Sequence, residues 1–177
     1  MAGLSIDSGH LDAMTQAALA SYPQECCGLL VGRRVFAVTG QSQSEEDHRE
    51  VLEVVAVENA WERSQLAYTD AQGSGEMEHS LGDRYWIDPA AMLQVQRSAR
   101  ERELEIIGIY HSHPDHPAVP SECDRRLAWP VYSYVILSVQ SGQVMACQSW
   151  RLDDQHQFQP EAIKMIGSSA NKAPFLS

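Results

Sequence analysis

The stretch IIGIYHSHPDHPAVPSECDRRLAW (residues 106–129) decides the expected fold and the expected site. It opens with an apolar run that is typical of a buried strand. Alternate side chains of a strand share one face, so the imidazoles of His111 and His113 can reach one metal ion while Ser112 points away. Ser121 then suits the N-cap of a short helix. The stretch therefore predicts a strand, a loop and a helix built around a pair of metal ligands.

The spacing favours an open metal site of the kind used in catalysis. Asp124 follows Ser121 by three positions, so both side chains share one face of a helical turn and can turn back toward the histidines. Two His and one Asp leave the fourth position of a zinc ion open for water, as in catalytic zinc sites. An ordinary polar loop is the alternative. Other hydrolase signatures, such as H-E-x-x-H and G-x-S-x-G, are absent.

A hydrolytic zinc site also needs a general base, and a carboxylate outside this stretch must supply it. Glu25 is the leading candidate because it precedes the apolar run CCGLLV, where a carboxylate would be partly desolvated. Glu122 is nearer in sequence, but beside Ser121 it would face solvent in the first helical turn. The alternative is that Glu25 only caps a strand.

The elements expected elsewhere indicate a mixed fold of the α/β (α+β) class. They are a helix from Ser8 that stops at Pro23, two strands joined by a tight turn at Gly32–Arg34, an acidic loop over residues 44–50, a strand over 51–60, a helix opened by Asp88 and Pro89, and strands over 133–139 and 144–152. We expect one domain over residues 1–166, with an insertion loop at 61–83, followed by a C-terminal tail at 167–177.

Composition excludes several classes of function. The formal net charge of −11, with thirteen Lys and Arg in 177 residues, argues against a nucleic-acid partner. The apolar runs are far shorter than the roughly 20 residues that cross a membrane. The first residues do not resemble a secretory signal, and the four cysteines form no C-x-x-C pair, so we expect a cytoplasmic protein with reduced thiols. The sequence shows no Cys-His pair that would support a thiol mechanism.

Together these residues resemble a known family. Glu25, the run His111–Ser112–His113, Ser121 and Asp124 match the JAMM motif of the MPN+ metalloproteases: an upstream Glu, then H-S/T-H, seven residues, S, two residues, D. The flanking segments are similar to those of the small bacterial members: PQECCGLLVG, Asn59, RYWIDP, GIYHSHP, PSECD and SYVILSV. The resemblance covers about residues 10 to 153.

The resemblance implies a fold and a set of roles. The fold would be a cytidine-deaminase-like central mixed β-sheet flanked by helices. One Zn²⁺ ion would be held by His111, His113 and Asp124. Glu25 would act as the general acid and base, and Ser121 would help to hold the oxyanion.

The resemblance also implies a substrate class. Similar members typically cut after the C-terminal Gly-Gly of a ubiquitin-like or sulfur carrier protein, releasing cysteine or trimming a pro-form. A carrier tail would dock as an extended strand at a sheet edge near the zinc ion. The alternatives are an isopeptidase that acts on lysine-linked conjugates and a non-catalytic MPN scaffold for protein interactions. The oligomeric state stays open, and a homodimer is one possibility.

Overall fold

The computed structural model describes residues 3–37, 46–64 and 84–167. The order of its elements is β1 (Gly3–Asp7), α1 (Ser8–Ser21), β2 (Cys27–Ala37), β3 (Glu46–Val57), α3 (Pro89–Glu101), β4 (Glu105–Pro114), α4 (Glu122–Leu127), β5 (Ser133–Gln140), β6 (Gln143–Leu152) and β7 (Phe158–Ile166). Helices and strands therefore mix along the chain, as the sequence predicts.

The strands form one mixed sheet that closes on itself in the order β1, β3, β2, β4, β5, β6, β7. β2 is antiparallel to both β3 and β4, whereas β4 and β5 run parallel. β1 pairs in parallel with β3 on one side and with β7 on the other, which closes the barrel. The mixed sheet is confirmed. Neither β1 nor β7 was expected from the sequence.

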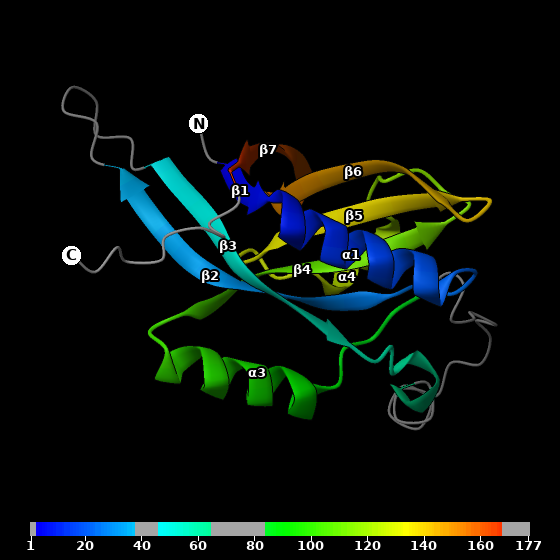
Figure 1. Ribbon diagram of the computed structural model, residues 1–177, viewed down its shortest axis with the longest axis horizontal. Coiled ribbons are helices and arrows are strands. Elements are labelled where there is room, and N and C mark those ends of the chain that lie inside the picture. The colour runs from blue at the N-terminus through cyan, green and yellow to red at the C-terminus, as the bar shows by residue number, and fades with distance from the viewer. Residues whose placement is uncertain (1–2, 38–45, 65–83, 168–177) are drawn as a thin grey trace, which may run out of the picture.

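Helices α1 and α3 cover opposite sides of this sheet (Figure 1). Met14 and Ala18 of α1 pack into one core cluster, which includes Leu30 of β2. Ala99 of α3 packs into the other cluster, which includes Leu29. Consecutive strand residues point to opposite faces, so neighbours in β2 serve different cores. The sheet flanked by helices is thus confirmed.

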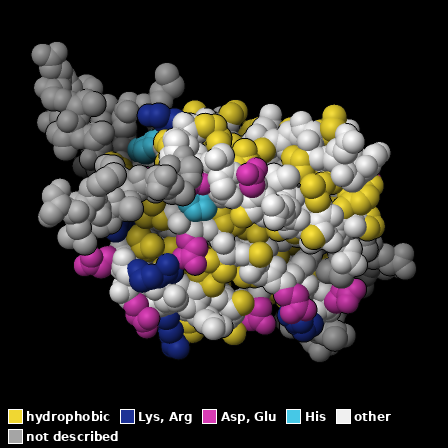
Figure 2. Space-filling model, viewed as in Figure 1, with side chains coloured by type: hydrophobic (Ala, Val, Ile, Leu, Met, Phe, Trp, Pro, Cys, Tyr) yellow, Lys and Arg dark blue, Asp and Glu magenta, His cyan; other side chains and the backbone are white. Residues whose placement is uncertain are grey.

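Charged side chains on the face shown in Figure 2 gather mainly over its lower half, where acidic and basic groups are interspersed. Arg102 pairs with Glu53 at 2.7 Å, and Arg34 pairs with Glu105 at 3.5 Å. These pairs place basic groups beside acidic ones. In the described part of the chain no helix is both long and apolar enough to cross a membrane.

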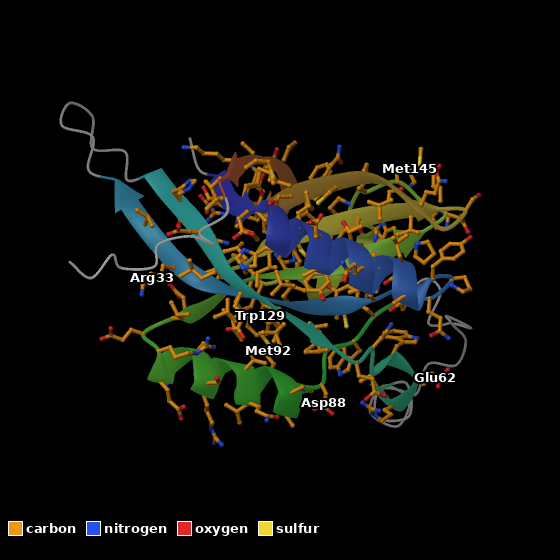
Figure 3. The ribbon with its side chains drawn as sticks, in the orientation of Figure 1. Arg33, Glu62, Asp88, Met92, Trp129 and Met145 are labelled. Atoms are coloured by element: carbon orange, nitrogen blue, oxygen red, sulfur yellow. The ribbon has the colours of Figure 1, made fainter. Side chains whose placement is uncertain are left out.

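The second expected helix begins where the sequence indicates. Asp88 is the N-cap of α3, and its carboxylate accepts a hydrogen bond from the N–H of Ala90 at 2.7 Å. Asp88 lies at the start of that helix in Figure 3. The N-cap of α1 is Asp7 rather than Ser8, because the Asp7 carboxylate accepts from the N–H of His10. The helix itself begins at Ser8, as the sequence predicts.

The expected hairpin at Gly32–Arg34 is wrong, because β2 continues through these residues as one strand. They pair with residues 49–51 of β3, and the register shifts between Val31 and Gly32, which marks a β-bulge. A Cβ atom added at Gly32 would lie 1.9 Å from the carbonyl oxygen of Glu50. The glycine therefore permits a close approach of two backbones, not a turn.

The acidic segment over residues 44–50 is not simply a loop, because β3 begins at Glu46. Arg49 is 1% exposed and bonds to Asp47, to the carbonyl of Ile107 and to the hydroxyl of Ser133. Paired charges can be buried in a strand, which hydropathy alone does not reveal. The expected strand over 51–60 starts earlier than predicted and ends at Val57.

Two predicted regions fall largely outside the description. Residues 61–64 form a helical turn, whereas the rest of the expected insertion, 65–83, and the tail residues 168–177 lie outside the described residues. The division into a domain and a tail stays a prediction. The later expected elements agree with β4, α4, β5 and β6.

Candidate metal centre

Strand β4 brings two imidazoles together at its buried end. His111 and His113 are both buried, and their Nε2 atoms lie 3.0 Å apart. They point to the same side because strand side chains alternate. The structure therefore brings together the pair that the H-S-H spacing predicted.

Helix α4 adds a carboxylate to this pair. Asp124 is buried, with Oδ1 lying 3.3 Å from Nε2 of His111 and Oδ2 lying 3.5 Å from Nε2 of His113. A capping box holds Asp124 in place, because its Oδ2 accepts from the N–H of Ser121 at 2.6 Å while the Ser121 hydroxyl accepts from the N–H of Asp124. Within the described residues these three side chains form a cluster of possible metal ligands.

The geometry of the cluster fits one zinc ion. Ligand atoms held 2.0–2.1 Å from a tetrahedral zinc lie about 3.3 Å from one another. The separations of 3.0, 3.3 and 3.5 Å scatter around that value. Nδ1 of His113 lies 2.9 Å from the carbonyl oxygen of Pro117, an acceptor that places the proton on Nδ1 and leaves Nε2 for a metal.

Electrostatics favours the metal-binding protonation state at Asp124 and His111 and opposes it at His113. Burial raises the pKa of Asp124, but the charge and hydrogen bond of His111, together with hydrogen bonds from His113 and from the Ser121 side chain, outweigh it and hold the pKa far below its usual range. Burial lowers the pKa of His111 despite its attraction to Asp124, which favours the neutral imidazole. Burial also opposes the charged form of His113, but Asp124, Glu25 and the Pro117 carbonyl raise its pKa overall.

Glu25 lies just before β2 and is 6% exposed. β2 pairs Cys27 with His111, so the antiparallel register runs Glu25 toward His113. Its negative charge contributes to the raised pKa of His113. Glu25 is not part of the ligand cluster. Glu25 is thus a buried carboxylate close enough to the cluster to affect the charge of His113.

Ser121 is half-buried at the start of α4. Its oxygen accepts the N–H of Asp124 at 3.1 Å, and its side chain also hydrogen-bonds the Asp124 carboxylate. Glu122, the other carboxylate considered as a base, is exposed and bonds to Arg125. That arrangement agrees with a solvent-facing residue in the first helical turn.

Two residues near the cluster belong, in the sequence, only to the segments that flank the JAMM motif. The ring of Tyr85 stacks on His111, with centroids 4.4 Å apart and planes 24° apart. The Asn59 side chain bonds to the carbonyls of Glu25 and Arg84. Both positions belong to the flanking segments on which the resemblance rests, but nothing in their spacing shows that they reach the site.

The cysteines near the cluster do not suit nucleophilic catalysis. Cys26 and Cys27 are buried, and burial raises the pKa of both thiols, that of Cys27 to about 12. Burial also raises the pKa of Cys123. The thiols therefore stay protonated near neutral pH, whereas the thiolate is the nucleophile.

This fold and this cluster agree with a family assignment. A family model described as prokaryotic homologs of the JAB domain matches residues 7–153. The chain belongs to this JAB/MPN family, which the JAMM motif residues already indicated.

Two similar proteins carry names of cleaving enzymes. The chain is 26% identical to a desampylase from Haloferax volcanii over 140 residues, which are 78% of each protein. It is 43% identical over 53 residues, 29% of this chain and 35% of the relative, to a probable TtuB-protein conjugate cleaving protease from Thermus thermophilus.

Solved structures show the same fold. A protein from Desulfitobacterium hafniense superposes with a TM-score of 0.68 at 26% identity, covering 93% of this chain and 94% of the other. A protein from Salinibacter ruber gives a TM-score of 0.57 at 26% identity, covering 99% and 95%.

Proposed function

We propose that this chain is a zinc-dependent metallopeptidase that cleaves the bond after the C-terminal Gly-Gly of a ubiquitin-like or sulfur carrier protein. The observation that carries the proposal is the convergence of His111, His113 and Asp124 beside the buried carboxylate of Glu25. Three protein ligands and an adjacent base are the parts that hydrolysis at an open zinc site requires.

Glu25 and Ser121 carry the chemistry that the chain itself supplies. A bound zinc ion supplies a Lewis acid that lowers the pKa of water and polarises a carbonyl. Glu25 accepts the proton of the attacking water and returns it to the leaving amine as the C–N bond breaks. The O–H of Ser121 donates to the developing oxyanion, a contribution of about 3 kcal/mol. Water and the amide give a carboxylate and a protonated amine without a covalent enzyme intermediate.

The names of the relatives support a ubiquitin-like substrate. The Thermus relative is named for cleaving TtuB-protein conjugates, which favours an amine leaving group supplied by another protein. A lysine-linked isopeptide is therefore the second candidate substrate, beside cysteine release and trimming of a pro-form. A non-catalytic scaffold is disfavoured because all five motif residues are present and the three ligands converge.

A carrier tail cannot dock by pairing as an extra strand beside β4, the strand that holds the two histidines. β4 lies between β2 and β5, and His111 has a pairing partner on each of those strands. An extended tail therefore has no free backbone edge beside His111. We expect it to cross the face of the cluster instead.

Intact-mass analysis tests the proposal. A Gly-Gly carrier with a C-terminal cysteine or short extension is incubated with the zinc-loaded parent, with Glu25→Gln and with Glu122→Gln, each with and without chelator. The parent and Glu122→Gln are expected to release a product that ends at Gly-Gly. Glu25→Gln should lose about 10²- to 10⁴-fold in kcat. Cleavage that survives the chelator or Glu25→Gln would contradict the mechanism. A lysine-linked conjugate cleaved in place of the extended carrier would select the second substrate.

A further inference from the structure

We propose that Ser112 and Asn59 are positioning residues for Glu25, acting as a clamp on the peptide unit that joins Glu25 to Cys26. The inference rests on the proposed function, in which Glu25 transfers protons. The clamp itself consists of contacts that exist without substrate or metal.

Both polar groups of this one peptide unit are held by side chains. The N–H of Cys26 donates to Oγ of Ser112 at 2.8 Å. The carbonyl oxygen of Glu25 accepts from Nδ2 of Asn59 at 3.1 Å. Because a peptide unit is planar and rigid, two bonds at its opposite edges fix its rotation. The position of the Glu25 Cα atom, from which its side chain leaves the backbone, is fixed with it.

Ser112 links this peptide directly to the metal ligands. It is fully buried and lies between His111 and His113 in β4. Its backbone N–H also donates to the carbonyl of Cys26 at 3.2 Å, so Ser112 contacts the segment after Glu25 twice. A shift of the strand that carries the imidazoles therefore moves the base as well.

Asn59 ties a second part of the site to the same peptide. Its Nδ2 also donates to the carbonyl of Arg84 at 2.9 Å, and its Oδ1 accepts the N–H groups of Trp61 and Trp86, each at 3.1 Å. These four bonds satisfy the whole amide group. The segment held in this way includes Tyr85, which stacks on His111. The amide thus connects the backbone of the base to the packing of a ligand.

The clamp explains why the polar side chains of Ser112 and Asn59 form hydrogen bonds with backbone groups. The catalytic effect of a base depends on its reach to the proton, and a displacement of about 1 Å can cost about 10²-fold in rate. Ser112→Ala removes the acceptor of the Cys26 N–H and leaves the metal ligands in place. We therefore expect kcat to fall about 10- to 100-fold, with KM and zinc content unchanged.

A double-mutant cycle separates positioning from a structural role. Ser112→Ala is made in the parent and in Glu25→Gln, and Ser112→Thr keeps the hydroxyl as the conservative variant. If Ser112 acts through Glu25, its removal changes kcat less than twofold in the Glu25→Gln background, and Ser112→Thr recovers most of the parent rate. An equal loss in both backgrounds would overturn the inference.

Amide hydrogen exchange, followed by NMR, tests the clamp without any substrate. The N–H of Cys26 should exchange at least about tenfold faster in Ser112→Ala than in the parent, because its acceptor is gone. Ser149→Ala is the matched control, since Ser149 is also a buried strand serine but donates to Glu161 in the distant β6–β7 pair. It should leave Cys26 unchanged.

Failure of the proposed function and failure of the clamp give different experimental results. A parent that cleaves no carrier or conjugate would refute the proposed function, while the exchange rate of Cys26 would still report on the clamp. Equal exchange of Cys26 in the parent and in Ser112→Ala would overturn the clamp even in an active peptidase.

Discussion

Asp124 contacts both imidazoles and Ser121, and those contacts keep its carboxyl ionised although it is buried. The same burial favours the neutral form of His111. A metal site needs this combination, because an ionised carboxylate and neutral imidazoles bind the ion. At the scale of single residues, the protonation states of Asp124 and His111 therefore match the proposed ligand roles, whereas metal binding must compete with a proton at His113, whose pKa is raised.

Removal of one ligand should weaken zinc binding strongly. In His111→Ala we expect the affinity for zinc to fall by more than about 100-fold, because changes in supporting residues alone cost 10- to 100-fold. Competition with a chromophoric chelator measures the affinity. His116→Ala is the control, since His116 is exposed in the loop after β4. Parent-like affinity in His111→Ala would remove this residue from the site.

Among the elements, β2 and β4 determine where the site residues meet. Their pairing places Cys27 opposite His111 and so brings Glu25 to the cluster. The register depends on an irregularity in each ladder, because β2 shifts against β3 at Val31/Gly32 and against β4 at Leu30/Val31. A strand slip of one residue would turn side chains to the other face.

Gly32 should therefore tolerate no side chain. Gly32→Ala places a Cβ atom 1.9 Å from the carbonyl oxygen of Glu50, and a backbone atom cannot move aside cheaply. We expect the free energy of unfolding to fall by about 1 to 3 kcal/mol. Urea denaturation measures the change. Gly9→Ala is the control because its Cβ would make only an ordinary 3.4 Å contact in α1; an equal effect of the two would contradict the close approach.

Across the whole molecule, closure of the barrel joins the two ends of the described chain. β1 and β7 pair in parallel from Gly3 with Ala162 to Asp7 with Ile166. Charged side chains also link strands that are not neighbours, since Asp47 of β3 accepts from Arg151 of β6 at 2.7 Å and from Arg49 at 3.2 Å. Stability should therefore depend on contacts far from the metal cluster.

Stability should have an acid-sensitive component at Asp47. Burial raises the pKa of Asp47, but Arg49 and Arg151 outweigh it and lower the pKa below its ordinary value. A lowered folded-state pKa contributes stability above the unfolded-state value of about 3.9, and this is lost as the pH falls through the folded-state pKa. Asp47→Asn should lower the free energy of unfolding by about 1 to 2 kcal/mol at pH 7, less than for a fully buried pair.

Denaturation of the parent and Asp47→Asn at several pH values measures this component. Their difference should shrink below about pH 4, where the parent carboxyl also becomes neutral. A difference that stays constant to pH 2 would show that Asp47 acts through packing rather than charge.

Truncation tests the expected domain boundary. A chain that ends at Asp153 lacks β7 and leaves β1 and β6 without their shared neighbour, so we expect it to lose cooperative thermal unfolding. A chain that ends at Gly167 keeps every described strand and should melt within a few degrees of the parent. Circular dichroism follows both transitions. Loss of the fold in the longer truncation would move the boundary beyond residue 166.

The sequence by itself determined the features that depend on short spacing. An H-x-H pair on a strand, a Ser N-cap three positions before an Asp, and Asp88 ahead of Pro89 each define local geometry through the periods of strand and helix. For that reason the three proposed ligands and the start of α3 were readable in advance. The resemblance to the JAMM motif pointed to Glu25, whose role the spacing alone left open.

The tertiary structure decided what depends on long-range register. The contact of Asn59 with Glu25, the stacking of Tyr85 on His111 and the burial of Arg49 join residues far apart in sequence. Local propensity cannot encode these contacts, because they arise only when strands pair in one register. The bulge at Gly32 and the closure of β1 on β7 have the same cause. The structural role of this glycine and of these two strands depends on the backbones that pair with them.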